Sequence, residues 1–245
     1  MNKAVFWDFD GTLVHSNESF LCSLSNSLLK YNYIVERHVI RDFLTSVCSW
    51  NMPQRDYVDM IRENWWNELL DKITLFCNKY GIEKEESVLI CKGFKENVIH
   101  YEYKLYDDAE KALSSCKLKG YNNYLLTNNF PEIVQVVERY GLDKYFCDYF
   151  VSTNIGYEKP RIEIFNYALR AANHPDVCYM VGDNPIADIN GAQKAGIKTI
   201  LVHNKSNSIF SDFCCEELLD YHVPFGLCSS DDYLCHDHAA CPCSV

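Results

Sequence analysis

Apolar residues follow two different rhythms along this chain. A short apolar run at 3–7 predicts a buried strand near the start. From about 16 to 104, apolar residues recur every three or four positions, which is the spacing of one face of a helix. This spacing predicts four helices, near 20–28, 39–47, 57–80 and 84–100. Ser16 or Asn17 is expected to cap the first, and Gly81 to end the third.

From about 105 onward, short apolar runs alternate with helical segments. The runs predict strands at 124–127, 148–152, 177–181 and 198–202. The segments between and before them predict helices at 109–119, 131–140, 160–171 and 187–195, the second with Pro131 in its first turn. Strands that alternate with helices indicate an α/β fold with a parallel sheet and right-handed crossovers.

The change of rhythm also predicts how the chain is divided. Residues 1–15 and 105–226 are expected to form one discontinuous α/β domain, into which an all-helical domain, 16–104, is inserted. The remaining segment, 227–245, differs in composition because it is rich in cysteine and histidine.

Composition narrows the possible partners. The 245 residues carry a formal net charge of −11, which disfavours nucleic acid and anionic membranes as partners. Hydrophobic residues make up 48% of the chain, enough for a sizeable core. No secretory signal is recognisable at the start, and the 13 cysteines are odd in number and mostly scattered singly. We therefore expect a cytoplasmic protein, either a monomer or a homodimer, with no disulfide framework.

Polar residues gather where the predicted strands end. Asp8 and Asp10 follow the first strand, and Thr127 closes the second, just before Asn128. In parallel sheets, ligands bind beyond the carboxyl ends of the strands. A hydroxyl beside free N–H groups at the start of a helix can hold a phosphate group.

The segments after the third and fourth predicted strands add both signs of charge. Lys159 precedes a proline, which disfavours a helical conformation and predicts an extended loop ahead of the next helix. Asp183 and Asp188 follow the strand at 177–181. Carboxylate oxygens suit Mg²⁺. One ionised aspartate could attack phosphorus while its neighbour donates and accepts a proton, which explains why Asp8 and Asp10 lie so close together.

Four segments resemble the motifs of the haloacid dehalogenase-like hydrolases, in the order of that family. They read Asp-Phe-Asp-Gly-Thr-Leu, Leu-Leu-Thr-Asn-Asn, Glu-Lys-Pro-Arg-Ile-Glu-Ile-Phe and Val-Gly-Asp-Asn-Pro-Ile-Ala-Asp. The resemblance covers about 3–203. It implies a Rossmann-like core, a helical C1 cap inserted after the first motif, a Mg²⁺ cofactor and phosphatase activity on a small phosphorylated metabolite.

The resemblance also implies a role for each matching residue. Asp8 would be the nucleophile and Asp10 the acid and base. Thr127 and Lys159 would hold the phosphate, with Asn128 beside them. The Mg²⁺ ligands would be Asp8, the backbone carbonyl of Asp10, and Asp183, with Asp188 in support.

Two features leave questions open. His15 stands where many capped members carry an acidic residue, at the expected cap hinge. In the tail, the run Cys235-His236-Asp237-His238, followed by Cys241 and Cys243, could bind Zn²⁺, but the spacings match no standard zinc finger, and we favour a tail without metal.

The substrate is not readable from the residues, and a sugar phosphate, a nucleoside monophosphate or a phosphoglycolate-like metabolite all fit. A phosphomutase of the same family is an alternative, because it uses the same aspartyl-phosphate. A non-catalytic binding protein with this fold is another. Haloacid dehalogenation is disfavoured because that chemistry needs no second aspartate in the first motif.

Overall fold

The computed structural model describes residues 1–203 and 211–219, so the Cys/His-rich segment at 227–245 lies outside the described residues. At the centre is a six-stranded parallel sheet in the order β3-β2-β1-β4-β5-β6. The strands are β1 (Lys3–Trp7), β2 (Asn122–Thr127), β3 (Phe146–Val151), β4 (Val177–Gly182), β5 (Lys198–Val202) and β6 (Phe213–Cys215). The predicted α/β fold with a parallel sheet is confirmed.

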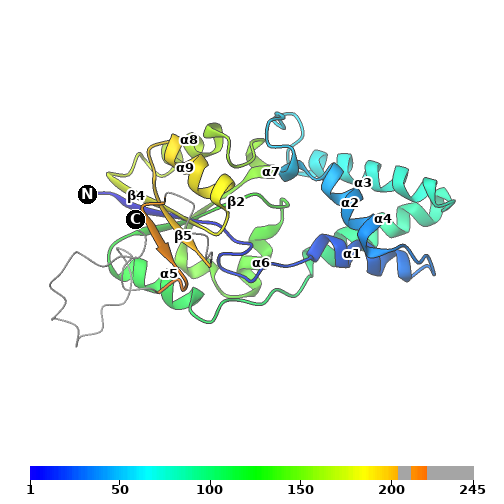
Figure 1. Ribbon diagram of the computed structural model, residues 1–245, viewed down its shortest axis with the longest axis horizontal. Helices are drawn as coiled ribbons and strands as arrows, with labels where there is room; N and C mark the ends of the chain where they lie inside the picture. The colour runs from blue at the N-terminus through cyan, green and yellow to red at the C-terminus, as the bar shows by residue number, and fades with distance from the viewer. Residues whose placement is uncertain (204–210, 220–245) are drawn as a thin grey trace.

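Both faces of the sheet are covered because neighbouring residues of a strand point to opposite sides. On one face Ala4 and Phe6 of β1 pack in a core with Phe165 of α8 (Ile162–Ala171) and Ala192 of α9 (Gly191–Lys194). Val5 and Trp7 point to the other face, in a core shared with α5 (Ala109–Leu118) and α6 (Ile133–Arg139). Figure 1 shows these two layers of helices on either side of the sheet.

Four helices lie together at one end of the molecule, away from the sheet (Figure 1). They are α1 (Ser19–Leu29), α2 (Arg37–Val47), α3 (Glu63–Lys79) and α4 (Lys84–Ile99), and we call them the helical group. All four come between β1 and α5 in the chain, as the sequence predicts. The exact domain boundaries stay a prediction, because one continuous apolar cluster runs from the helical group to the sheet.

The helix expected over 57–80 starts six residues late, at Glu63. Residues 57–62, just before this helix, are hydrogen-bonded instead to the segment that follows β3. The N–H of Tyr57 donates to the carbonyl of Gly156 at 3.0 Å, and the N–H of Arg62 donates to that of Thr153 at 2.8 Å. Nearby, the hydroxyl of Ser49 donates to the buried carboxylate of Glu158. These backbone donors are therefore used in a contact between distant segments, which a helical periodicity does not report.

Other helix starts also differ from the prediction. Pro131 lies before α6, which begins at Ile133. The helix expected at 187–195 is a π-helical turn, η3 (Pro185–Asn190), followed by the short α9. The N-cap of α1 is Glu18, so the prediction of Ser16 or Asn17 is wrong; the Asn17 side chain still accepts the N–H of Ser19, the first residue of the helix, at 3.0 Å.

Short elements complete the chain. They are the 3₁₀ turns η1 (Ser49–Asn51) and η2 (Asp143–Tyr145) and the helix α7 (Ser152–Ile155). The predicted strand at 148–152 is β3, and it ends at Val151 because Ser152 already belongs to α7. Within the described part of the chain, no helix has the length and apolar character needed to cross a bilayer.

Candidate active site

The site lies where the sheet reverses its strand order. From β1 the chain first builds β2 and β3 on one side and then crosses to β4 on the other. Loops leaving β1 and β4 therefore diverge at their carboxyl ends, which is where ligands bind in such sheets. The structure places Asp8 just after β1 and Asp183 just after β4. The N–H of Asp8 continues the ladder by donating to the carbonyl of Val181 at 2.9 Å.

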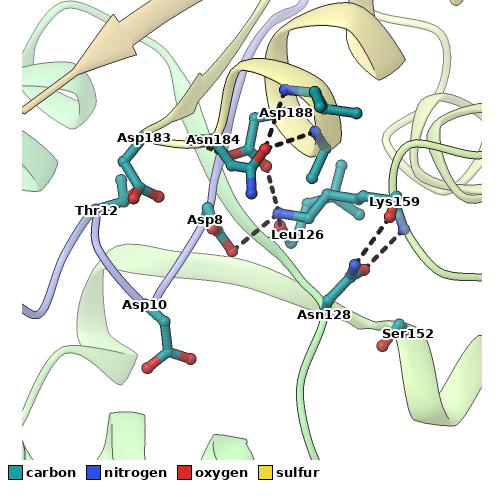
Figure 2. A network of polar contacts seen from close by, with 12 residues as sticks. Asp8, Asp10, Thr12, Leu126, Asn128, Ser152, Lys159, Asp183, Asn184 and Asp188 are labelled. Carbon is teal, nitrogen blue, oxygen red and sulfur yellow. Dashed lines mark hydrogen bonds and ion pairs between the residues drawn. The ribbon is translucent and has the colours of Figure 1, made fainter. Parts of the chain in front are cut away.

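Lys159 is at the centre of a buried network (Figure 2). Its Nζ lies 2.9 Å from Oδ1 of Asp8 and 2.6 Å from Oδ1 of Asp188, and it donates to the carbonyl of Leu126 at 3.0 Å. Its side chain is only 1% exposed. Burial alone would lower the pKa of Lys159, but the two carboxylates outweigh it and raise the pKa, so the ammonium stays charged.

The backbone of Lys159 is held by Asn128. The Asn128 side chain accepts the N–H of Lys159 at 2.8 Å and donates to its carbonyl at 3.0 Å. Figure 2 shows this double contact beside the lysine side chain. Asn128 lines the same cavity as Thr127, and its amide is used to fix the lysine loop. Phosphate binding by Asn128 thus stays a prediction, and positioning of Lys159 is what its contacts demonstrate.

Three carboxylates converge beside the lysine. Oxygen atoms of Asp8, Asp183 and Asp188 all lie within 4.8 Å of one another. Burial and the charge of Asp8 raise the pKa of Asp183 to about 6. Asp188 is fully buried, and its second oxygen accepts the N–H of Asn184 at 3.0 Å.

Glycines make this crowding possible. Gly11 has φ +78°, and a Cβ on it would lie 2.3 Å from Oδ2 of Asp183. A Cβ on Gly182 would lie 2.2 Å from Oδ2 of Asp188. Both positions therefore require glycine for close packing against a carboxylate.

The three carboxylates fit a hard divalent cation. They offer oxygen ligands of the kind Mg²⁺ prefers, and they concentrate negative charge that a cation would relieve. The raised pKa of Asp183 reports that crowding of charge. The donor set and its electrostatics therefore suit a metal at the expected place.

Asp10 lies apart from this network, as Figure 2 shows. Its two carboxylate oxygens accept the side-chain amides of Asn17 and Asn129, the latter at 2.6 Å. Burial and then the charge of Asp8 raise the pKa of Asp10 to about 6, while the two amides oppose the shift. Asp8 and Asp10 line the same cavity, as predicted, but they are held by different partners.

Asn17 and Asn129 have a contact with Asp10 that sequence reasoning missed. Asn129 follows Thr127 and Asn128 in the second motif, so its position next to the site was a usable signal. Asn17 carried no such signal, because it reaches Asp10 only through the path of the chain into α1.

His15 lies where the chain passes toward the helical group. The His15 ring stacks on the Tyr106 ring with centroids 3.9 Å apart. The backbone N–H of His15 donates to the backbone carbonyl of Lys104 at 2.8 Å. Residues 15 and 104 are thus the two places where the chain enters and leaves the group, side by side.

The site opens into a cavity of about 690 Å³ between the sheet edge and the helical group. This volume falls within the range of about 300–1,000 Å³ that is usual for small-molecule sites. Asp8, Asp10, Thr127, Lys159 and Asp183 line one end of it, and α1, α2 and the turn after α2 line the other.

Comparison with known proteins agrees with this geometry. The family model described as haloacid dehalogenase-like hydrolase matches residues 2–196. Glyceraldehyde 3-phosphate phosphatase from Pyrococcus furiosus is 36% identical over 212 residues, which is 81% of this chain and 79% of the relative. The protein of the same name from Methanothermobacter thermautotrophicus is 30% identical over 91% of this chain and 95% of its own.

Other matches are shorter or concern the fold alone. Phosphoserine phosphatase from Thermus thermophilus is 35% identical over 102 residues, so the chain spans only 41% of the length of that relative. The structure of a hydrolase of this type from Bacillus subtilis, YfnB bound to magnesium, has a TM-score of 0.67 at 20% identity, covering 87% of this chain and 93% of its own. The match of the family model over most of the chain, with all four motifs on one sheet edge, leads to one conclusion: the chain belongs to the haloacid dehalogenase-like hydrolase family.

Proposed function

We propose that this chain is a Mg²⁺-dependent phosphatase, which hydrolyses a small phosphate monoester through an aspartyl-phosphate. The observation that carries the proposal is the position of Lys159, whose buried ammonium joins Asp8 and Asp188 at the base of a cavity. The phosphatase names of the relatives that match over most of the chain support the same reaction class.

Asp8 is the proposed nucleophile. Its Oδ1 is held by Lys159 at 2.9 Å, which fixes the orientation of the carboxylate. Lys159 and the Thr127 hydroxyl would bind the phosphate oxygens, so that the phosphorus meets Asp8. The bond from phosphorus to the ester oxygen breaks as the bond from Asp8 to phosphorus forms.

Asp10 is the proposed proton carrier. With a pKa of about 6, it holds a proton in part of the molecules near neutral pH and can give it to the leaving ester oxygen. The resulting carboxylate then takes a proton from the water that attacks the phosphoenzyme. The amides of Asn17 and Asn129 fix both oxygens of Asp10 during this exchange.

Asp8, the Asp10 carbonyl and Asp183 would hold Mg²⁺, with Asp188 fixed beside them. When bound, the metal would neutralise the charge of the phosphate and of the surrounding carboxylates. Without such a charge, the acidic site would repel its substrate.

The size of the cavity admits three classes of substrate. A sugar phosphate, a nucleoside monophosphate and a phosphoglycolate-like acid are all small enough for the cavity. The names of the relatives include an aldose phosphate and an amino-acid phosphate as substrates of those proteins.

Turnover of p-nitrophenyl phosphate with and without Mg²⁺ tests the proposal. Hydrolysis should require Mg²⁺ and stop in excess EDTA, and full turnover in excess chelator would exclude the assignment. Absence of any turnover would favour a non-catalytic binding protein. Conversion of glucose 1-phosphate into glucose 6-phosphate, without release of phosphate, would instead support a phosphomutase.

A further inference from the structure

We propose that Arg41 selects substrates that carry a carboxylate at the end remote from the phosphate, so that the preferred substrates are phosphorylated hydroxy acids. This inference rests on the proposed phosphatase function, because it concerns the other end of the same cavity.

One side of α2 faces the cavity. Arg41, Leu44, Thr45 and Cys48 all line it, and their spacing of three or four residues places them on one helical face. Arg41 is therefore part of the cavity wall, although it belongs to the helical group and not to any of the four motifs.

Positive charge is scarce in this cavity. Among the described residues that line it, the cations are Lys159 and Arg41, against the carboxylates of Asp8, Asp10, Glu18 and Asp183. Lys159 is already engaged by Asp8 and Asp188 at the catalytic end. A second anionic group of the substrate would thus find its attractive partner in Arg41.

Glu18 does not neutralise Arg41 completely, because it is shared. Arg37 and Arg41 each donate to a different oxygen of Glu18. Two positive charges against one leave the cluster with a net charge of about +1. Arg41 gives one N–H to Glu18, whereas a guanidinium has five donors in a planar fork. The remaining N–H groups can therefore donate two parallel hydrogen bonds to a second carboxylate.

The size of this charge favours a carboxylate over a second phosphate. A net charge of about +1 matches one carboxylate, whereas a phosphate monoester brings a charge of about −1.5 to −2 close to Glu18.

The wall between the two ends suits a carbon chain with hydroxyl groups. Phe20 and Trp50 meet edge to face, with centroids 4.9 Å apart, and both line the cavity. Thr45 and Asn51 add polar side chains to the same wall. Carbon atoms can therefore lie against the rings while hydroxyls bond to the polar groups.

A matched pair of esters tests the proposal. 6-Phosphogluconate and glucitol 6-phosphate have the same open chain and differ at C1, which is a carboxylate in the first and a CH₂OH group in the second. We expect kcat/KM of the native protein to be at least tenfold higher for 6-phosphogluconate. The shorter pair, 3-phosphoglycerate and glycerol 3-phosphate, shows whether the preference depends on chain length.

Variants assign the preference to one residue. Arg41→Gln should bring the ratio of the two kcat/KM values close to one, mainly through a higher KM for 6-phosphogluconate, and Arg41→Lys should retain part of the ratio. Glu18→Gln should increase the ratio, because it removes a competing negative charge. Arg55→Gln is the matched control, because Arg55 is also ion-paired, to Glu68 of α3, but does not line the cavity. It should leave the ratio unchanged.

The outcomes distinguish the proposed role of Arg41 from the proposed phosphatase activity. If p-nitrophenyl phosphate is hydrolysed but the ratio is below two, or neither ester of a pair is hydrolysed, the role of Arg41 is wrong and the phosphatase assignment stands. A native ratio that survives Arg41→Gln also overturns the proposal. If p-nitrophenyl phosphate is not hydrolysed at all, the proposed function fails and this inference fails with it.

Discussion

The two ends of the cavity use ion pairs in opposite ways. At the sheet edge, Lys159 is 1% exposed and its partners Asp8 and Asp188 are nearly or fully buried. At the helical end, Arg41 is 53% exposed and Glu18 is 45% exposed. A buried pair is costly to break, because the remaining charge stays without a partner, whereas an exposed pair is worth about 0–1 kcal/mol. The ion pairs of Lys159 at the sheet edge should therefore persist whichever substrate is bound. At the helical end, Arg41 can exchange Glu18 for an anionic group of the substrate.

This comparison predicts that substitutions in the buried network around Lys159 affect all substrates alike. Asp8→Asn keeps nearly the same shape but removes the nucleophile. We expect kcat to fall about 10⁴-fold or more on every ester, because units of this kind depend strongly on each member. Steady-state rates over a panel of esters measure this. A loss confined to some substrates would contradict the proposed division.

Asp10→Asn should cause a loss that depends on the leaving group. A poor leaving group needs the proton of Asp10, whereas p-nitrophenolate does not. With p-nitrophenyl phosphate we expect a burst of product close to one equivalent, followed by slow turnover, because water then lacks its base. Quenched mass spectrometry should detect phosphate on Asp8. Equal loss in the Asp8 and Asp10 variants, with no burst and no phosphoenzyme, would favour direct attack by water.

At the helical end, Trp50→Ala should change the ranking of substrates. The ring of Trp50 packs against Phe20 and lines the cavity wall, so its loss removes contact with the part of the substrate beyond the phosphate. We expect KM to rise about tenfold for long esters and much less for short ones. Tyr80→Ala is the control, since Tyr80 is an exposed aromatic residue just after α3 that does not line the cavity. A uniform fall in kcat on all esters would contradict the proposal that the helical end determines the ranking of substrates.

The smallest expected effect is that the stabilisation of the folded protein by Mg²⁺ depends on pH. The folded-state pKa of Asp183 is about 6, above its ordinary value of 3.8, so this carboxyl favours folding below about pH 4 and that contribution is lost as the pH rises through about 6. Mg²⁺ competes with the proton for the ionised form, so it should raise the melting temperature more at pH 7 than at pH 5.

Melting curves with Mg²⁺ and with EDTA at equal ionic strength measure this difference. Asp183→Asn should reduce it strongly. The same shift at both pH values in the native protein would argue against a metal at Asp183.

The order of helices and strands could be predicted from the sequence, because most of these elements have a local pattern of apolar residues and glycines. Apolar runs such as 3–7 correspond to strands, and Gly81 and Gly120 follow the ends of helices. The strand β6 was missed, since its three residues become a strand only by pairing with β5. The late start of α3 was missed as well, because the backbone N–H groups of Tyr57 and Arg62 donate to carbonyls about a hundred residues away in the chain.

For the site, the sequence by itself determined which residues come together. The carboxyl ends of parallel strands share one edge, so Asp8, Thr127 and Asp183 had to meet wherever the strands paired. Only the tertiary structure decided how they are held. That Asn128 fixes the Lys159 loop, that Asn17 and Asn129 hold Asp10, and that Arg41 faces the cavity all depend on the packing of distant segments. Hydrogen bonds require side chains to lie within about 3 Å of each other, and no local spacing in the sequence reports such a distance between separate elements.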